Sequence, residues 1–232
     1  MVVGDPTYLR DVPPDQPRGI GLVRGALRGP AGRSVWPNLP GSTEELSLLS
    51  KLFPLQEGSN LFQKREASRA NVSALQTTSA LARFKYVVFS THGYLDRQNS
   101  DLSGIVLAQA VLKDDDDGYL RASDLAAYSF RSDLVFISAC ETGLGTFVSG
   151  EGVLGLPYAL FAAGNANTVL TLWQIFDGST AEFTHRFFGK VKAGIAIASA
   201  LAETKREFVR GDAGEERRSP AHWAPFVLYG GT

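Results

Sequence analysis

The sequence has little of what marks several special classes of protein. One cysteine in 232 residues, Cys140, rules out an internal disulfide, so nothing calls for an oxidising compartment. Lysine and arginine number 23 against 24 acidic residues, and this balance gives no overall attraction to nucleic acid or acidic membranes. No basic start precedes a long apolar stretch, and no window reaches about 18 uncharged apolar residues, so neither a secretory signal nor a membrane span is expected. We predict a cytoplasmic protein that binds neither nucleic acid directly nor a membrane.

What the sequence does contain is an alternation of short apolar runs and amphipathic segments. Predicted strands lie in MVVGDP, KYVVFST, SGIVLA, DLVFISA, NTVLTLWQIF and APFVLYG. Predicted helices lie in STEELSLLSKLF, from about residue 70, in GVLGLPYALFAAG, and over residues 180–190 and 193–210. Right-handed crossovers between such units give a mostly parallel sheet with helices on both faces. We therefore predict one α/β domain over residues 1–232.

The segment between the first strand and the first helix is unusual in composition. Residues 9–40 are crowded with glycine and proline, carry five arginines, and are predicted to form a long loop with a short hairpin around residues 19–27. A loop of that length is more often functional or mobile than idle, although a solvated insertion would explain it equally well. The helix that follows has Ser42 or Thr43 as its cap, and Glu45 completes a capping box.

Two predicted strands lead into residues that can act together in catalysis. KYVVFST runs into His92 and Gly93, and DLVFISA runs into Cys140. Parallel sheets gather functional residues at the carboxyl ends of their strands, so neighbouring strands would place this imidazole and thiol at one edge, as a nucleophile and its base require. The amides of Gly93 and Cys140 could then hold an oxyanion. A structural histidine and a buried small cysteine would also explain each residue singly, and the pattern alone leaves both interpretations open.

Six segments follow one another in the order found in a known family: THG, SGIVLA, SACETGLG, GEGVLGLPYALFAAG, TVLTLWQIFDGST and HWAPFVLYG. This succession resembles the CHAT domain, a branch of the caspase-like (clan CD) cysteine peptidases related to separase, over essentially the whole chain. The resemblance implies a caspase-haemoglobinase-like fold and endopeptidase activity on a protein or peptide substrate, with His92 and Cys140 as the catalytic pair. This chemistry requires no cofactor. Because CHAT domains commonly follow a helical-repeat array, such a regulatory region or an activator protein is an expected partner.

One departure from the family bears on substrate choice. Family members often carry two consecutive acids after the LW strand, whereas this chain has Phe176 and Asp177. By the resemblance, Asp177 lies near the pocket for the side chain preceding the cut and favours a basic residue there. An acid is also expected at this position simply to stabilise the start of the helix at GSTAEF. Ser138 and Glu141, on either side of the cysteine, complete the predicted substrate-binding residues.

The run KDDDDGYLRASD is only superficially similar to a calcium-binding loop, because Lys113 would take the first ligand position and Asp124 the twelfth, so we predict an acidic turn and no metal site. The alternative to a peptidase is a catalytically silent or self-inhibited protein-interaction domain, in which Cys140 serves only for packing. A thiol acylhydrolase that uses the same two residues is a third interpretation.

Overall fold

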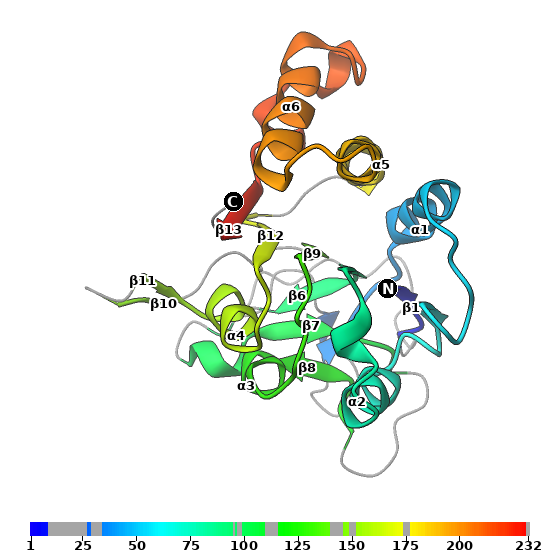
Figure 1. Ribbon diagram of the computed structural model, residues 1–232, viewed down its shortest axis with the longest axis vertical. Coiled ribbons are helices and arrows are strands. Elements are labelled where there is room, and N and C mark those ends of the chain that lie inside the picture. The colour runs from blue at the N-terminus through cyan, green and yellow to red at the C-terminus, as the bar shows by residue number, and fades with distance from the viewer. Residues whose placement is uncertain are drawn as a thin grey trace.

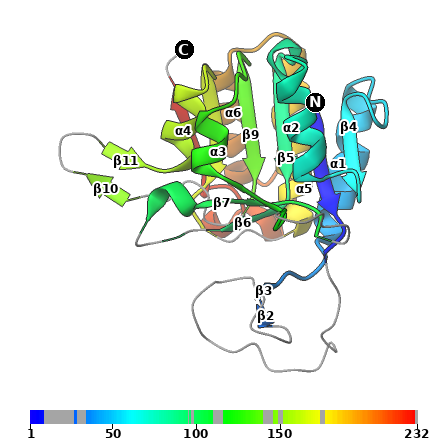
Figure 2. The ribbon, with the colours of Figure 1, turned by 90° about the horizontal axis from the view of Figure 1, so that it is seen from below.

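The computed structural model describes residues 1–8, 27–28, 34–94, 96, 99–109, 116–139, 146–148, 152–173 and 177–230. Its centre is a six-stranded sheet in the order β13-β12-β9-β5-β1-β4 (Figures 1 and 2). The strands are β1 (Val2–Pro6), β4 (Leu61–Lys64), β5 (Tyr86–Ser90), β9 (Leu134–Ser138), β12 (Asn167–Thr171) and β13 (Phe226–Gly230). All neighbours pair in parallel except the edge strand β13, which is antiparallel to β12. The predicted, mostly parallel sheet is confirmed.

Helices cover both faces of this sheet, as predicted (Figures 1 and 2). One layer holds α1 (Pro40–Leu52), α5 (Asp177–Lys192) and α6 (Ile197–Arg210), and the other holds α2 (Arg69–Thr77), α3 (Ala122–Ala126) and α4 (Leu156–Ala162). Short 3-10 turns lie at Leu81–Arg83, Ser100–Leu102, Glu215–Arg217 and Pro220–His222. Among the residues that the structure describes, no helix is both long enough and apolar enough to cross a bilayer.

The two cores are built from alternate residues of the same strands. In β9, Leu134 and Phe136 belong to the core under α1, α5 and α6, whereas Val135 and Ile137 belong to the opposite core. Successive side chains of a strand point to opposite faces, so a run with no polar interruption is what a doubly covered strand requires. Phenylalanine dominates the first core: the Phe136 ring centroid lies 5.4 Å from that of Phe187. The apolar run DLVFISA therefore fixes the middle of the sheet.

A second sheet departs from the simple alternation. The run SGIVLA does form a strand, β7 (Gly104–Val106), but it pairs antiparallel with β6 (His92–Tyr94) and β8 (Tyr119–Arg121) outside the main sheet. The connection from β6 to β7 is too short for a parallel crossover, so the chain turns back on itself. Gly104 permits the close packing, since a Cβ there would lie 2.4 Å from the carbonyl oxygen of Leu120. This small sheet begins at His92.

The predicted cap of the first helix is wrong. Helix α1 begins at Pro40, and its N-cap residue, Leu39, makes no side-chain cap. Proline suits this first turn because its φ is already helical and its missing N–H costs nothing there. Ser42 instead serves tertiary contacts: its hydroxyl accepts from the amide of Asp5 at 2.7 Å and donates to the carbonyl of Ser90 at 2.8 Å. The capping box is absent because its residues face the sheet.

Several short elements complete the fold. Helix α3 begins at Ala122 with Arg121 as its N-cap residue, and the amide of Arg121 donates to Asp124 at 3.0 Å. Two short strand pairs add to the fold: β2 (Leu27–Arg28) with β3 (Ser34–Val35), and β10 (Thr146–Val148) with β11 (Gly152–Leu154). Except for Leu27, the hairpin predicted at residues 19–27 lies outside the described residues.

Candidate active site

The predicted catalytic strands are neighbours in the sheet. Strands β5 and β9 pair in parallel with Ser90 opposite Ser138, and the amide of Thr91 donates to the carbonyl of Ser138 at 3.3 Å. His92 follows Ser90 by two residues, as Cys140 follows Ser138. Cys140 and Glu141 lie outside the described residues, so the nearest described neighbour on that strand is Ala139, which is 2% exposed. Both strands therefore run out at the same edge, where Figure 2 places β6 and β7.

His92 is held tightly, with 5% of its surface exposed. Its imidazole lies between two aromatic rings, with centroids 5.1 Å from Tyr8 and 4.9 Å from Trp36. Its Nε2 lies 2.7 Å from the carbonyl oxygen of Pro37. A carbonyl can only accept, so Nε2 carries the proton in this contact, and the neutral ring then has its lone pair on Nδ1. The geometry thus selects one tautomer of the histidine.

Tyr8 fixes the backbone on which His92 stands. Its hydroxyl accepts from the amide of His92 at 3.3 Å and lies 2.9 Å from the hydroxyl of Thr91. The same hydroxyl donates to the carbonyl of Val106 at 3.2 Å, and the hydroxyl of Thr91 donates to that carbonyl too. Burial raises the pKa of the Tyr8 phenol far above its ordinary value. Tyr8 therefore stays neutral and joins β1, β5 and β7 at the point where His92 leaves the main sheet.

A small open cavity of about 40 Å³ lies beside His92. It is bounded by the strand ends and by the first turns of helices α1 and α5. Its lining residues are Leu39, Gly41, Ser42, Glu45, Ser90, Thr91, His92, Ser138, Ala139 and Thr180. Its lining is polar: five residues carry hydroxyls, beside one imidazole and one carboxylate, and polar groups of these kinds orient ligands in binding sites.

The carboxylate in this cavity belongs to Glu45, a residue that sequence reasoning had assigned to a helix cap. Its side chain is almost fully buried, with 1% exposed. One oxygen accepts from the hydroxyl of Ser90, and the other accepts from the hydroxyl of Thr184 at 2.6 Å. A signal was present in the sequence: Glu45 stands one turn before Leu49, on the apolar face of its helix. An acidic residue on the apolar face of a helix is a sequence signal for a candidate functional site.

The chain matches the family model for the CHAT domain over residues 1–231. It belongs to the CHAT domain family. The resemblance inferred from the six sequence segments is thereby confirmed, and the mostly parallel α/β sheet described above is the caspase-haemoglobinase-like architecture that the resemblance implied.

The individual relatives of this CHAT domain share less than a third of its residues over the matched segments. A segment of 111 residues, 48% of the chain, is 27% identical to tetratricopeptide repeat protein 28 of Mus musculus and 26% identical to that of Homo sapiens. The match spans 4% of the length of each relative. Among solved structures, the chain is similar to a chain of the Saccharomyces cerevisiae separase–securin complex, with a TM-score of 0.48 and 15% identity over 82% of this chain and 11% of that one.

The remaining predicted residues of the CHAT domain fall in three positions. Ser138 lines the cavity at 7% exposure, next to His92. Gly93 is buried in β6 opposite Ile105. Asp177 is the first residue of α5, whose fourth residue, Thr180, lines the cavity; the Asp177 side chain itself lies outside the description. The structure thus brings together His92, Ser138 and the start of α5.

The carboxylates of the acidic turn, Asp116 and Asp117, accept hydrogen bonds from groups close by in the chain. Asp116 accepts from the amide of Gly118 at 2.9 Å, and Asp117 accepts from the amide of Tyr119 at 3.0 Å and from the guanidinium of Arg121. These contacts close a turn in which Gly118 has a φ of +76°. Within the part of the chain that the structure describes, no three His, Cys, Asp or Glu residues gather closely enough to hold a metal ion.

Proposed function

We propose that this CHAT domain is a cysteine endopeptidase with Cys140 as nucleophile and His92 as base. One observation carries the proposal: Ser90 and Ser138 are paired in register, and each stands two residues before its member of the dyad. This register supports a site in which both chain segments continue at the same edge of the sheet, beside the cavity that His92 lines.

The proposed reaction uses the tautomer that Pro37 favours. The Cys140 thiol gives its proton to Nδ1 of His92, and the thiolate attacks the carbonyl carbon of the scissile peptide. The amides of Gly93 and Cys140 hold the resulting oxyanion. As the tetrahedral species collapses, the C–N bond breaks and the leaving amine takes the proton from His92, which leaves an acyl-enzyme thioester. A water molecule, deprotonated by His92, then hydrolyses the thioester and restores the thiol.

Throughout this cycle the Nε2–H of His92 keeps its partner. The carbonyl of Pro37 accepts from the neutral imidazole and from the imidazolium alike. Tyr8 and Trp36 pack against the ring without adding a charge that would oppose either state. The histidine can take up and release a proton on Nδ1 without turning.

For the substrate, we propose a protein cut after a basic residue. Glu45 supplies a buried carboxylate in the cavity, and Asp177 stands at the start of α5, three residues before the cavity residue Thr180. A carboxylate that is itself shielded from water, as Glu45 is, attracts a cationic side chain more strongly than one in open solvent. Ser138 and Glu141 complete the predicted contacts around the bond to be cut. On the sequence grounds given above, we place this activity in the cytoplasm.

A second function, protein interaction, is favoured by the surface of α4. Tyr158 and Phe161 on this helix are 59% and 72% exposed. Residues 152–176 contain no charged side chain at all. Exposed aromatics in an uncharged surface are typical of docking sites. The curated relatives are named for tetratricopeptide repeats, which are helical, so we propose a helical-repeat segment or activator protein as the partner.

The test of the peptidase is covalent labelling with a peptidyl acyloxymethyl ketone that ends in arginine, read by intact mass. Since the chain has one cysteine, an adduct of one probe mass reports Cys140 alone. We expect the wild type to be labelled and His92→Ala to be labelled at least about 100-fold more slowly. A thiol that reacts with iodoacetamide but with no peptidyl probe would favour the silent interaction domain.

A further inference from the structure

We propose that Trp36 and Tyr119 form a positioning pair that holds His92 in its reactive orientation. The inference rests on the proposed function of His92 as a base, and it extends that function to two residues from other parts of the chain. Neither residue touches the reacting atoms; each acts through the imidazole and through the carbonyl of Pro37.

Trp36 packs directly against the imidazole of His92. The residue is 2% exposed, and its ring centroid lies 4.9 Å from that of His92 at an interplanar angle of 36°. Trp36 directly precedes Pro37, whose carbonyl accepts from Nε2 of His92 at 2.7 Å. One dipeptide therefore supplies both the aromatic wall of the imidazole and the acceptor that sets its tautomer. Any movement of Trp36 displaces both.

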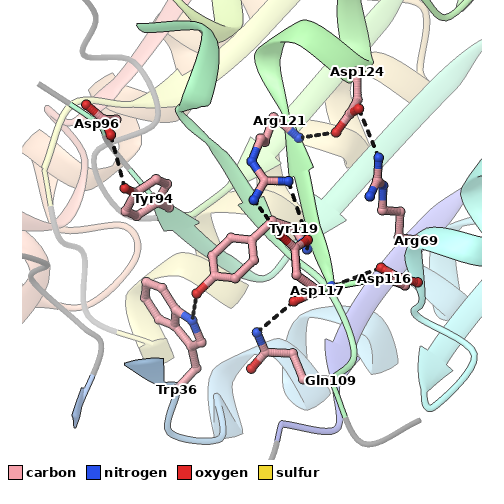
Figure 3. Close-up of polar contacts among 11 residues, drawn as sticks. Trp36, Arg69, Tyr94, Asp96, Gln109, Asp116, Asp117, Tyr119, Arg121 and Asp124 are labelled. Atoms are coloured by element: carbon pink, nitrogen blue, oxygen red, sulfur yellow. Dashed lines mark hydrogen bonds and ion pairs between the residues drawn. The ribbon is translucent and has the colours of Figure 1, made fainter. Parts of the chain in front are cut away.

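The dipeptide of Trp36 and Pro37 is held in place by a side-chain hydrogen bond and not by regular secondary structure. Residues 36–39, all of them described, form neither helix nor strand between β3 and α1, so no backbone ladder fixes them. The indole Nε1 of Trp36 donates to the hydroxyl of Tyr119 at 2.9 Å (Figure 3). Indole has no second polar group, so this bond determines how far and in which direction the ring reaches. It joins the irregular segment to strand β8.

Tyr119, which anchors Trp36, is itself fixed by contacts with Tyr94 and Arg121. Its ring meets that of Tyr94 edge-on at 5.8 Å and lies 5.5 Å from the guanidinium of Arg121. Arg121 is in turn paired with Asp117, which also accepts from the backbone amide of Tyr119 (Figure 3). Tyr94 and Tyr119 lie on β6 and β8 of the small sheet, and β6 itself begins at His92. The anchor of Trp36 is therefore tied to the same sheet as the histidine.

The experiment compares Tyr119→Phe with Tyr94→Phe in the full chain. Both variants keep the aromatic ring and lose one hydroxyl, but only the hydroxyl of Tyr119 accepts from Trp36; that of Tyr94 donates to Asp96 at 3.3 Å. With ¹⁵N-labelled protein, the ring nitrogens of the three histidines are resolved and assigned by His→Gln variants. This readout reports the tautomer of His92 and needs no enzymatic activity.

We expect the wild type and Tyr94→Phe to show His92 protonated on Nε2, with that proton protected from exchange with water. In Tyr119→Phe, exchange should quicken by about 3- to 10-fold and the other tautomer should appear, as the loss of one hydrogen bond predicts. Cys140 labelling by the arginine acyloxymethyl ketone should slow by about the same factor in its maximal rate, with little change in the probe concentration for half-maximal rate. Trp36→Phe should slow labelling at least as much as Tyr119→Phe, since it also shrinks the aromatic wall beside His92. The double variant should be no slower than Trp36→Phe alone, because both substitutions remove the same hydrogen bond.

The outcomes separate this inference from the proposed function. Unchanged ring shifts and exchange in Tyr119→Phe, or effects that add in the double variant, would overturn the positioning pair even in an active peptidase. A wild type that no peptidyl probe labels would count against the peptidase, while the tautomer comparison would still decide whether Trp36 and Tyr119 orient His92. Equal effects of Tyr119→Phe and Tyr94→Phe would also refute the proposal, since they would reflect loosening of the small sheet as a whole.

Discussion

His92 and Glu45 line one cavity, yet the protein holds them by opposite means. His92 packs against the rings of Tyr8 and Trp36 and donates to the backbone carbonyl of Pro37, all of them uncharged groups. Glu45 accepts hydrogen bonds from the hydroxyls of Ser90 and Thr184. A base must change its charge during a reaction, whereas a recognition group must keep it. In the proposed function the comparison therefore separates proton transfer on one wall from substrate recognition on the other.

The largest effects should follow removal of the dyad. We expect Cys140→Ala to abolish cleavage of a fluorogenic peptide ending in arginine, and His92→Ala to lower kcat by about 10²- to 10⁴-fold, the usual contribution of a general base. Cys140→Ala should unfold in urea near the wild-type midpoint if the thiol acts in chemistry, whereas His92→Ala removes a buried ring that packs against Tyr8 and Trp36 and should unfold at a lower urea concentration. Cleavage that survives in Cys140→Ala would remove the basis of the proposed mechanism.

Glu45 gives the next largest effect, and two substitutions separate its two roles. Glu45→Ala leaves two buried hydroxyls without their acceptor and should lower the free energy of unfolding by about 2 to 3 kcal/mol. Glu45→Gln keeps one acceptor oxygen, so it should cost only about 1 kcal/mol. It should nonetheless reduce the preference for arginine over leucine probes by about 10-fold, because a charge-assisted contact is lost.

Urea titration and competitive labelling measure these two quantities on the same samples. If Glu45→Gln kept the full arginine preference, Glu45 would be a structural acid, and recognition would have to come from elsewhere in the cavity.

Asp177 should have a smaller effect on the same preference. As the first residue of α5 it stands near the cavity and also interacts favourably with the helix amino terminus, which is worth roughly 0.3 to 1 kcal/mol. We expect Asp177→Asn to lower the arginine-to-leucine ratio by about 3-fold and the free energy of unfolding by about 0.5 kcal/mol, measured as above. A fall in stability with an unchanged ratio would leave Asp177 with its helix role alone.

The central strands, and the meeting of the residues that follow them, could be predicted from the sequence for a physical reason. Strands covered on both faces are uninterrupted apolar runs, and KYVVFST and DLVFISA stand out as such. Because parallel strands end at one edge, the residues that follow them were expected together, and the pairing of β5 with β9 confirms that these strands are neighbours. Family membership added the identity of the fold, which periodicity alone does not provide.

The surroundings of His92 were beyond sequence reasoning. Trp36 and Pro37 follow a glycine- and proline-rich segment with no periodicity, and their partner His92 is 55 residues from Pro37. Likewise, Ser42 and Glu45 satisfy a local capping rule, but buried tertiary partners compete more strongly than the exposed amides of a first turn. Three-residue strands such as β8 also carry too few residues for an alternation to be seen.

The smallest predicted effect concerns Asp117, which supports Trp36 only indirectly, through Arg121 and Tyr119. Burial alone would raise the pKa of Asp117, but hydrogen bonds from Arg121 and from the amide of Tyr119 outweigh it, so the pKa lies below its ordinary value of 3.8. A carboxylate with a lowered folded pKa stabilises the protein above the unfolded pKa, and this contribution is lost as the pH falls through the folded value.

Asp117→Asn tests how far this support reaches. Its side chain is 44% exposed, so solvent screening limits the difference in unfolding free energy from the wild type at pH 7 to about 0.5 kcal/mol or less. That difference should vanish below the folded pKa, where the wild-type carboxyl is also uncharged, as urea titrations at both pH values would show. Labelling of Cys140 should change by less than about 2-fold, because Tyr94 still packs against Tyr119. A loss as large as that of Tyr119→Phe would mean that the orientation of His92 depends on an exposed ion pair, and the contrast between an uncharged wall and a charged wall would no longer hold.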